Sequence, residues 1–464
     1  MPDRITETQR QAVLRLLAQG EDRETIAAKV GITPGQVSSV AAHVKMGTYP
    51  LPEIGVEEQE GSSEQDNKTR NLLEKMRNLG RRPAVQTQLE PIFLGVDTEH
   101  DKKVFWNPDP DSGSANPHVL ILGESGFGKT YTIACLLAEL AQRNISSVIF
   151  DYGQGFTPST LPPEFLNVAN LVEIQASRDG IEINPLQIFP SDILGPVNVA
   201  QRVADTFARV YPKIGVQQHA VLRHAVLEVM SDEGIISDDT NSWTQDLPSF
   251  ANVHLKLTTY ANNPQNSHSH NAASVASHIS TLFFFNTFRS NGQKIAWQEV
   301  IDAKGRVLII QLKGLEHSLE RAVTEFLLWN LVGYIEALGP SPLRYFVVLD
   351  EAHKLSFDQG SPVEKLLREG RKFGLGLILA SQQPEDFSPV AFANTATKIV
   401  FQVGDEKSTI SRQLHRKVRD THSFGDIFHL ISKLPRGCAY VVSQNLGHFV
   451  RIGSFSDRER LWKL

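Results

Sequence analysis

The sequence predicts an α/β domain built on a mainly parallel sheet, with an inserted helical subdomain and a small all-α domain before it. Three observations support this fold class. Strand-like apolar runs alternate with helical segments over 91–464, residues 118–142 read as strand, glycine-rich loop and helix, and residues 6–45 read as three short helices. We therefore expect a helical domain over 1–48, a linker over 49–90 and a large α/β domain over 91–464.

The composition is that of a globular intracellular protein. The chain has 464 residues, of which 41% are hydrophobic and 21% charged, and its formal net charge is −6. Cys135 and Cys438 are too few for a disulfide framework and indicate a reducing cytoplasm. The polar N-terminus lacks the apolar core of a signal peptide, and no run approaches the roughly 20 apolar residues of a membrane span. The prediction is a cytoplasmic protein with no membrane partner.

The N-terminal 48 residues resemble a helix-turn-helix. Thr6 and Gln9 form a capping box that opens the first helix, 24–30 forms the second, and Thr33 with Gln36 opens the third. If the third helix enters a major groove, its exposed side chains are the candidates for DNA contacts. These side chains are Gln36, Ser38, Ser39 and His43. The charge of this segment is only weakly basic, so a module that docks on another protein is the alternative.

The segment 49–90 has the composition of a linker. Its acidic, Gln- and Ser-rich part, 57–66, contains too little apolar surface to fold alone. A short basic helix is expected over 72–79. The linker is therefore expected to separate the two domains.

The stretch HVLILGESGFGKT, residues 118–130, predicts a site that binds a nucleoside triphosphate. An apolar strand leads into Gly-x-x-x-x-Gly-Lys-Thr, and an amphipathic helix over 130–142 follows, which is the order that this motif requires. Glycines let the loop turn tightly so that backbone N–H groups point at phosphate oxygens at a helix N-terminus. Lys129 would reach the β- and γ-phosphates, and the Thr130 hydroxyl would bind Mg²⁺. The expected nucleotide-binding residues are Gly123, Glu124, Ser125, Gly126, Phe127, Gly128, Lys129 and Thr130.

A second apolar run, YFVVLDEAH over 345–353, ends in two carboxylates. Asp350 would join Thr130 as a Mg²⁺ ligand, and Glu351 would orient or deprotonate the attacking water. Acidic pairs also cap strands without any function, but the first motif makes the catalytic interpretation the better one. The letters Asp-Glu-Ala-His also spell a helicase box. Nothing else in the chain matches those helicases, so His353 receives no role.

The remaining strands are expected at 147–152, 306–312, 376–381, 398–403 and 439–443. They alternate with helical segments, which indicates a parallel sheet. Between the second and third strands of the domain lies a long, mostly helical stretch. We expect an inserted helical subdomain over about 160–300.

The segment 364–403, with its REGRKFG and ASQ motifs, resembles the region that follows the acidic strand in the HerA and FtsK superfamily of ring-shaped DNA motors. The order of parts also agrees: the phosphate loop, INPL at 183–186, RVLIIQLKGL at 306–315, and then FVVLDEAHK. The resemblance covers roughly 92–455 and is best to the HerA-like branch. It implies a RecA-like P-loop NTPase fold and a homo-oligomeric ring for which a hexamer is expected. It also implies double-stranded DNA and a separate nuclease or other effector as partners.

The same resemblance assigns further site residues. In that family a polar residue on the strand between the two motif strands senses the γ-phosphate, and Gln382 occupies the matching position. Arginines near the REGRK segment typically face the nucleotide of the neighbouring subunit. Arg371 and Arg368 are the candidates here, with Arg412 in reserve. The chain departs from the family in beginning with a helix-turn-helix where a small β-barrel is usual.

The functional prediction is a ring-forming, Mg²⁺-dependent ATPase that moves along double-stranded DNA. Two other classes remain open. One is a regulator in which the helix-turn-helix binds a DNA site and ATP only sets the oligomeric state. The other is a motor subunit of a phage-defence or conjugation system that feeds a partner nuclease or pore.

Overall fold

The computed structural model describes residues 6–18, 23–45, 89–109, 114–284, 288, 294–404, 424–444 and 446–463. The chain divides into two compact units, Met1–Leu79 and Gly80–Leu464. The short basic helix expected over 72–79 and the reserve arginine Arg412 lie outside the described residues. Both cysteines are buried and free. Among the helices in these ranges, none combines the length and apolar character that crossing a bilayer requires.

The N-terminal unit contains three short helices in the predicted order. They are α1 (Glu7–Ala18), α2 (Arg23–Val30) and α3 (Pro34–Lys45). Both capping boxes form: the Thr6 backbone N–H donates to Gln9 Oε1 at 2.9 Å, and the Thr33 N–H donates to Gln36 Oε1 at 2.9 Å. Apolar side chains at helical spacing close a small core of its own. This core contains Val13, Leu14, Ile26, Ala27, Val37 and Val40.

The second unit is built on an 11-stranded sheet in the order β2-β1-β11-β10-β9-β3-β8-β7-β4-β6-β5. All neighbours from β9 to β5 are parallel, and those from β2 to β9 are antiparallel. This sheet confirms the predicted mainly parallel α/β architecture. The strands are β1 (Ile92–Asp97), β2 (Lys103–Trp106), β3 (Val119–Leu122), β4 (Ser146–Asp151), β5 (Asn170–Gln175), β6 (Arg306–Gln311), β7 (Tyr345–Leu349), β8 (Leu375–Ser381), β9 (Thr397–Val400), β10 (Cys438–Ser443) and β11 (Leu446–Ile452).

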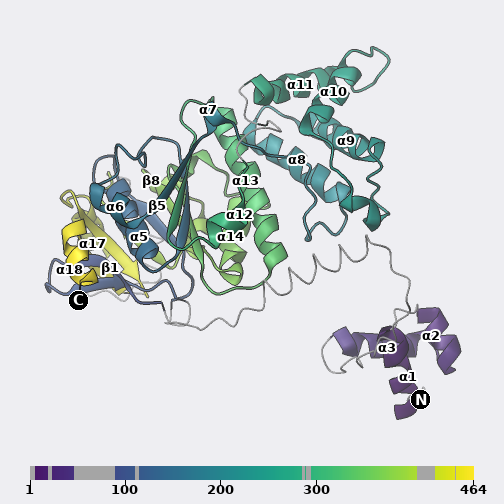
Figure 1. Ribbon diagram of the computed structural model, residues 1–464, viewed down its shortest axis with the longest axis horizontal. Helices are drawn as coiled ribbons and strands as arrows, with labels where there is room; N and C mark the ends of the chain where they lie inside the picture. The colour runs from purple at the N-terminus through teal and green to yellow at the C-terminus, as the bar shows by residue number, and fades with distance from the viewer. Residues whose placement is uncertain are drawn as a thin grey trace. The chain divides into compact units, whose positions relative to one another are not determined.

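The central strands are apolar along their whole length because both faces of the sheet are covered. In β3, Val119 and Ile121 face one core cluster, while Leu120 and Leu122 face the other. Helix α5 and the C-terminal helix α18 cover the first face, and α13 and α14 cover the second (Figure 1). The helices of these layers are α5 (Lys129–Gln142), α6 (Pro163–Val168), α7 (Ala176–Asp179), α12 (Trp297–Ile301), α13 (His317–Leu338), α14 (Pro362–Glu369), α15 (Pro389–Asn394), α17 (Phe424–Ile431) and α18 (Phe455–Trp462), with short 3₁₀ turns η3 (Ala352–Lys354), η4 (Gly370–Phe373) and η5 (Pro384–Asp386).

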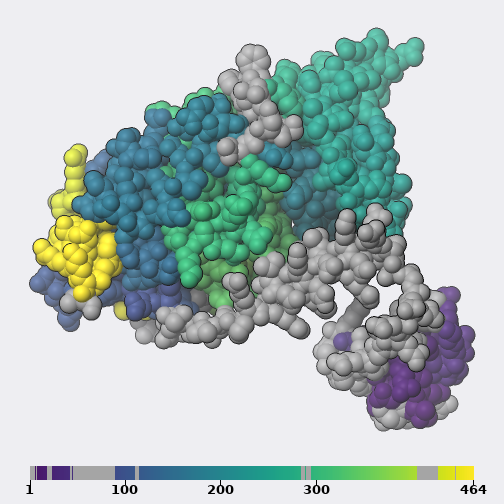
Figure 2. Space-filling model, viewed as in Figure 1, coloured from purple at the N-terminus to yellow at the C-terminus, as the bar shows by residue number. Residues whose placement is uncertain are grey.

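The stretch between β5 and β6 contains a group of helices that lies beside the sheet-bearing part of the unit. They are α8 (Pro196–Val210), α9 (Val216–Asp232), α10 (Phe250–Ala261) and α11 (Ser269–Phe284), with η2 (Thr240–Thr244) between them. Figure 2 shows this lobe in teal, joined to the blue and green part of the same unit. Phe207 of α8 stacks on Phe250 of α10 and tilts against Phe326 of α13, so one continuous core links the lobe to the sheet.

Four strands are absent from the sequence prediction. Strand β5 falls within the segment expected to be the helical insertion, yet it pairs with β6 at the edge of the sheet. An edge strand has one unpaired side and mixed side chains, so NLVEIQ lacks the apolar run that reveals a central strand. Strands β1, β2 and β11 extend the opposite side of the sheet in antiparallel fashion. Strands β2 and β11 carry the same mixed pattern, whereas β1 is almost wholly buried.

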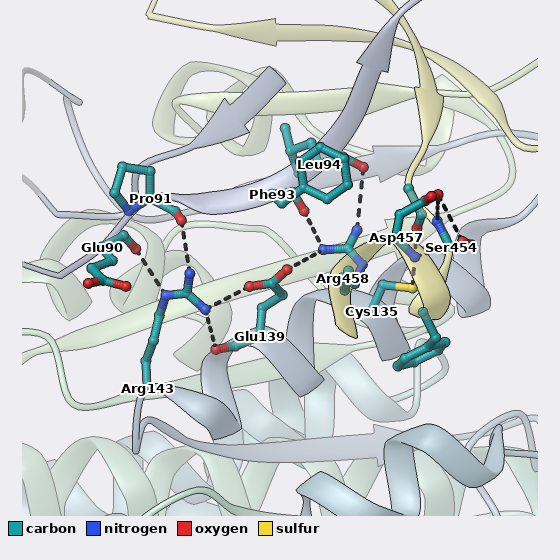
Figure 3. Close-up of polar contacts among 12 residues, drawn as sticks. Glu90, Pro91, Phe93, Leu94, Cys135, Glu139, Arg143, Ser454, Asp457 and Arg458 are labelled. Atoms are coloured by element: carbon teal, nitrogen blue, oxygen red, sulfur yellow. Dashed lines mark hydrogen bonds and ion pairs between the residues drawn. The ribbon is translucent and has the colours of Figure 1, made fainter. Parts of the chain in front are cut away.

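The helix that follows β3 is fastened to the end of the chain by a buried ionic network (Figure 3). The fully buried Arg458 of α18 donates to Glu139 Oε1 of α5 at 2.8 Å and to the backbone carbonyls of Phe93 and Leu94 in β1. Arg143 donates to Glu139 Oε2 at 2.6 Å. Each buried charge therefore has an opposite charge and hydrogen bonds, as a buried ion pair requires. The network fixes α5 against β1 and α18.

Candidate active site

The loop between β3 and α5 has a backbone that only glycine adopts without strain. Gly123, Gly126 and Gly128 have φ angles of 150°, 83° and 121°. A Cβ atom on Gly123 would also lie 2.5 Å from Cβ of Phe401, which is closer than such atoms approach. Ser125 and Gly126 are exposed at the crest of the loop, and the half-buried Phe127 packs against the core cluster below it. The loop thus has the conformation that directs successive N–H groups toward a bound anion.

Contacts with two later segments hold this loop in place. The Glu124 N–H donates to the Gln402 carbonyl at 2.8 Å, just beyond β9. The Gly437 N–H donates to the Phe127 carbonyl at 3.0 Å, just before β10. The sequence motif does not reveal these contacts, because the partners lie about three hundred residues further along the chain. They give the loop a fixed shape before any ligand binds, which lowers the entropy cost of binding.

Lys129 opens α5 and points back into the loop. Its Nζ donates to the carbonyl oxygens of Gly123 at 2.6 Å and Glu124 at 3.1 Å. Burial lowers the pKa of this amine, while the nearby carboxylates of Glu351 and Asp350 favour its charged form. The cation of the phosphate loop and the acidic pair therefore share one region of the structure.

The acidic pair follows β7 at the carboxyl ends of the parallel strands, where the phosphate loop also lies. Glu351 adopts the left-handed conformation, with φ 54° and ψ 47°, although it is not a glycine. Such strained backbone is typical of functional sites. Gln382, which follows β8 between β3 and β7, donates from Nε2 to Glu351 Oε1 at 3.3 Å. The structure thus brings Glu351 and Gln382 into contact, at the end of the strands where the phosphate loop lies.

His353, to which the sequence assigned no role, lies next to Glu351. Its Nδ1 is 3.2 Å from Glu351 Oε2 and 3.2 Å from Ser381 Oγ, at the end of β8. The turn η3 produces this proximity because it folds the chain back directly after the acidic pair. The sequence alone provides no reason to expect these contacts, because only the fold shows what the imidazole touches.

Thr130 and Asp350, the expected Mg²⁺ ligands, both lie next to Gly155. A Cβ atom on Gly155 would be 3.8 Å from Thr130 Oγ1 and 4.0 Å from Asp350 Oδ2. Asp151 holds the intervening loop by accepting hydrogen bonds from the N–H groups of Gly153 and Phe156. A hydroxyl and a carboxylate beside a phosphate loop form a donor set that suits Mg²⁺. The residues present therefore fit this ion.

Known proteins with similar sequences carry a domain of this kind. Residues 113–331 match the family model described as "Helicase HerA, central domain". A HerA helicase of Sulfolobus acidocaldarius, described as a DNA double-strand break repair helicase, is 24% identical over 339 residues, which cover 69% of this chain and 62% of that protein. The central part of this chain is therefore similar to the central domain of HerA helicases. The chain spans less than two thirds of the length of the HerA relatives that it matches.

Solved structures share the fold of the second unit. VirB4 of Thermoanaerobacter pseudethanolicus superposes with a TM-score of 0.63 at 18% identity and covers 78% of this chain and 96% of its own. Plasmid coupling protein TrwB in complex with ADP and Mg²⁺ gives a TM-score of 0.52 at 16% identity and covers 83% of this chain and 94% of its own. These similarities confirm the predicted RecA-like P-loop architecture.

The two candidate arginines lie at the opposite end of the strands from the phosphate loop of the same chain. Arg371 sits in η4, before β8, and its Nη1 donates to the Ala115 carbonyl, before β3. The phosphate loop follows β3, which is parallel to β8. Arg368 is already engaged in an ion pair with Glu364. Neither residue contacts its own loop, and Arg371 is the one that the structure leaves without a carboxylate partner among the described residues.

The side chains expected to be exposed on the third N-terminal helix are only partly so. Ser39 is exposed, but Gln36 and Ser38 are half-buried. Gln36 is engaged in the capping box with Thr33, while Ser38 donates back to the Pro34 carbonyl and accepts from Arg23 Nη1 at 3.4 Å. The expectation that all four are exposed is therefore wrong for these two, because the helix start uses them locally. The side chain of His43 lies outside the described residues.

Asp350 gives a pH-dependent prediction for the nucleotide-free protein. Burial raises the pKa of this carboxyl to about 7, and the charges of Glu351 and Asp151 act in the same direction. The folded protein keeps this proton up to about pH 7, whereas the unfolded chain loses it near pH 4, so this group costs stability as the pH rises between these values. We expect Asp350→Asn to melt at a higher temperature than the parent at pH 8, with the difference vanishing toward pH 4.

Thermal melting without Mg²⁺ or nucleotide at several pH values between 4 and 8 measures this effect. Asp238→Asn is the matched control, since Asp238 is exposed and belongs to the helical lobe. A melting-temperature difference for Asp350→Asn that stays constant across this range would contradict the assignment.

Proposed function

We propose that this chain is a Mg²⁺-dependent ATPase that assembles into a ring and moves along double-stranded DNA. The observation that carries the proposal is that the segments following β3, β7 and β8 meet at the carboxyl ends of these strands. Glu351, held in a left-handed conformation, contacts Gln382 and is close enough to Lys129 to influence its ionisation. A base, a polar sensor and a phosphate-binding cation in one place are the parts that phosphoryl transfer to water requires.

The chain's own residues would divide the chemistry as follows. The N–H groups of 123–130 and the Lys129 ammonium bind the β- and γ-phosphates. Thr130 and Asp350 would hold Mg²⁺, which neutralises charge on those phosphates when bound. Glu351 accepts a proton from the attacking water through its carboxylate, and Gln382 orients Glu351 and the γ-phosphate.

Support for DNA as the track comes from the relatives. The HerA proteins of Sulfolobus acidocaldarius and Sulfurisphaera tokodaii are described as DNA double-strand break repair helicases. Support for a ring comes from Arg371, which lies too far from its own nucleotide site to act there. The N-terminal unit has its own core and would recruit DNA or a partner protein. We place the assembled motor in the cytoplasm.

The test is steady-state ATP turnover by the full chain, with and without linear double-stranded DNA, on protein whose mass in solution is measured under the same conditions. A translocase is expected to hydrolyse ATP faster when DNA is present. If DNA does not change the ATP turnover of an assembled ring, the translocase proposal is eliminated. A sequence-specific DNA footprint together with slow hydrolysis would favour the ATP-switched regulator. In both tests Lys129→Ala serves as the inactive reference.

A further inference from the structure

We propose that Arg436 binds the phosphates of the nucleotide held by its own chain. This inference rests on the proposed function, since it assigns a further residue to the same site. Arg436 is not part of any sequence motif discussed above. It lies in the turn between α17 and β10, far from the phosphate loop along the chain.

The turn that carries Arg436 is attached directly to the phosphate loop. The N–H of the next residue, Gly437, donates to the Phe127 carbonyl at 3.0 Å, and Gly437 has a φ of 75°, which favours glycine. A Cβ atom placed on Gly126 would lie 3.7 Å from Arg436 Nη2. The guanidinium therefore lies beside the exposed crest of the loop, and the attachment is rigid because it runs through the backbone.

The charge of Arg436 is not used within the described part of the chain. Its side chain is exposed and makes no ion pair or hydrogen bond with any described residue. Several other arginines of the unit behave differently, because each of them has a carboxylate partner. Examples are Arg143, Arg202, Arg209 and Arg458.

Electrostatics identifies the class of ligand. The phosphate loop already contains the Lys129 ammonium and the inward N–H groups at the start of α5, so a second cation beside it is repelled unless an anion binds between them. A nucleoside diphosphate or triphosphate carries several negative charges at this point. A planar guanidinium forms paired hydrogen bonds to phosphate oxygens, which adds geometric selectivity. Arg436 would thus approach the phosphates from the outer side of the loop, opposite the buried Lys129.

The experiment measures the affinities of the full-length protein for ATP and ADP by calorimetry, in the presence of Mg²⁺. Charged hydrogen bonds of this kind contribute enough for Arg436→Ala to weaken both affinities by about 10- to 100-fold. Arg436→Lys should recover part of the loss, and Arg436→Glu should deepen it. Lys433→Ala is the matched control, because it removes an exposed cation three residues earlier.

Two further readings separate this proposal from a structural effect and from failure of the proposed function. The melting temperature of nucleotide-free Arg436→Ala should equal that of the parent. If Arg436→Ala binds ATP and ADP as tightly as Lys433→Ala does, or if Arg436→Lys recovers nothing, the assignment is overturned. If Lys129→Ala also binds nucleotide normally, then the proposed site itself is wrong, and not only the role of Arg436.

Discussion

Replacing Arg371 with alanine is expected to lower ATP turnover by the assembled protein by about 10³- to 10⁵-fold, the effect typical of an arginine that reaches a transferring phosphoryl group from a neighbouring subunit. The physical reason is topological. Arg371 precedes β8, while its own phosphate loop follows the parallel neighbour β3, so the length of the sheet separates them. At about 3.3 Å per residue, a four-residue strand already sets them more than about 13 Å apart. Its own nucleotide site is therefore out of reach, and we expect Arg371 to act on the nucleotide of another copy.

Mixing two inactive variants tests whether Arg371 acts between subunits. Arg371→Ala keeps its phosphate loop, and Lys129→Ala keeps its arginine. In a mixed ring, some neighbouring pairs form a complete site. The Arg371→Ala subunit supplies the phosphate loop and its nucleotide, and the adjacent Lys129→Ala subunit supplies Arg371. We expect turnover to return on mixing. Arg368→Ala is the control, because its side chain is occupied by Glu364 and its loss should change turnover little. Mixtures that stay inactive while forming normal rings would show that Arg371 acts elsewhere.

Glu351→Gln is expected to lower turnover by about 10²- to 10⁴-fold, which is the usual contribution of a positioned general base. The substitution preserves the shape of the side chain and its contact with Gln382, but it removes the carboxylate that accepts the proton of water. Nucleotide binding should survive, since Lys129 and the loop N–H groups are unchanged. The variant is therefore expected to hold unhydrolysed ATP.

Single-turnover hydrolysis and calorimetric ATP binding separate these two effects. Glu369→Gln provides the control, because Glu369 is an exposed glutamate at the end of α14. Normal hydrolysis by Glu351→Gln would mean that the left-handed residue at the end of β7 is not the base. His353 would then be the next group to consider, since its Nδ1 lies 3.2 Å from Glu351 Oε2.

The sequence predicts the centre of this molecule better than its edges, and the reason is physical. The central strands are covered on both faces, so each is a short, wholly apolar run that the pattern reveals to within three residues, as for β3 and β7. Strand β5 lies at an edge, where half-exposed polar residues such as Glu173 interrupt the run. The order of the strands in the sheet has no local signal at all.

The same distinction applies to the site. Residues 123–130 and the pair Asp350 and Glu351 are recognisable because their chemistry depends on contiguous backbone and on strand ends. Arg436 escaped the sequence analysis because its position depends on a backbone contact between segments about three hundred residues apart. His353 was visible but could not be interpreted, since the fold of η3 decides what it touches.

The buried arginine of α18 has a consequence for folding during synthesis. Glu139 stands on the helix that begins with Lys129, and its carboxylate is neutralised from inside by Arg458, more than three hundred residues later in synthesis. Before α18 is in place, Glu139 has only Arg143 as its ionic partner, and the carbonyl groups of Phe93 and Leu94 lack the donor that Arg458 provides. The helix that begins with Lys129 is therefore fully anchored only once α18 has been synthesised and has packed against it.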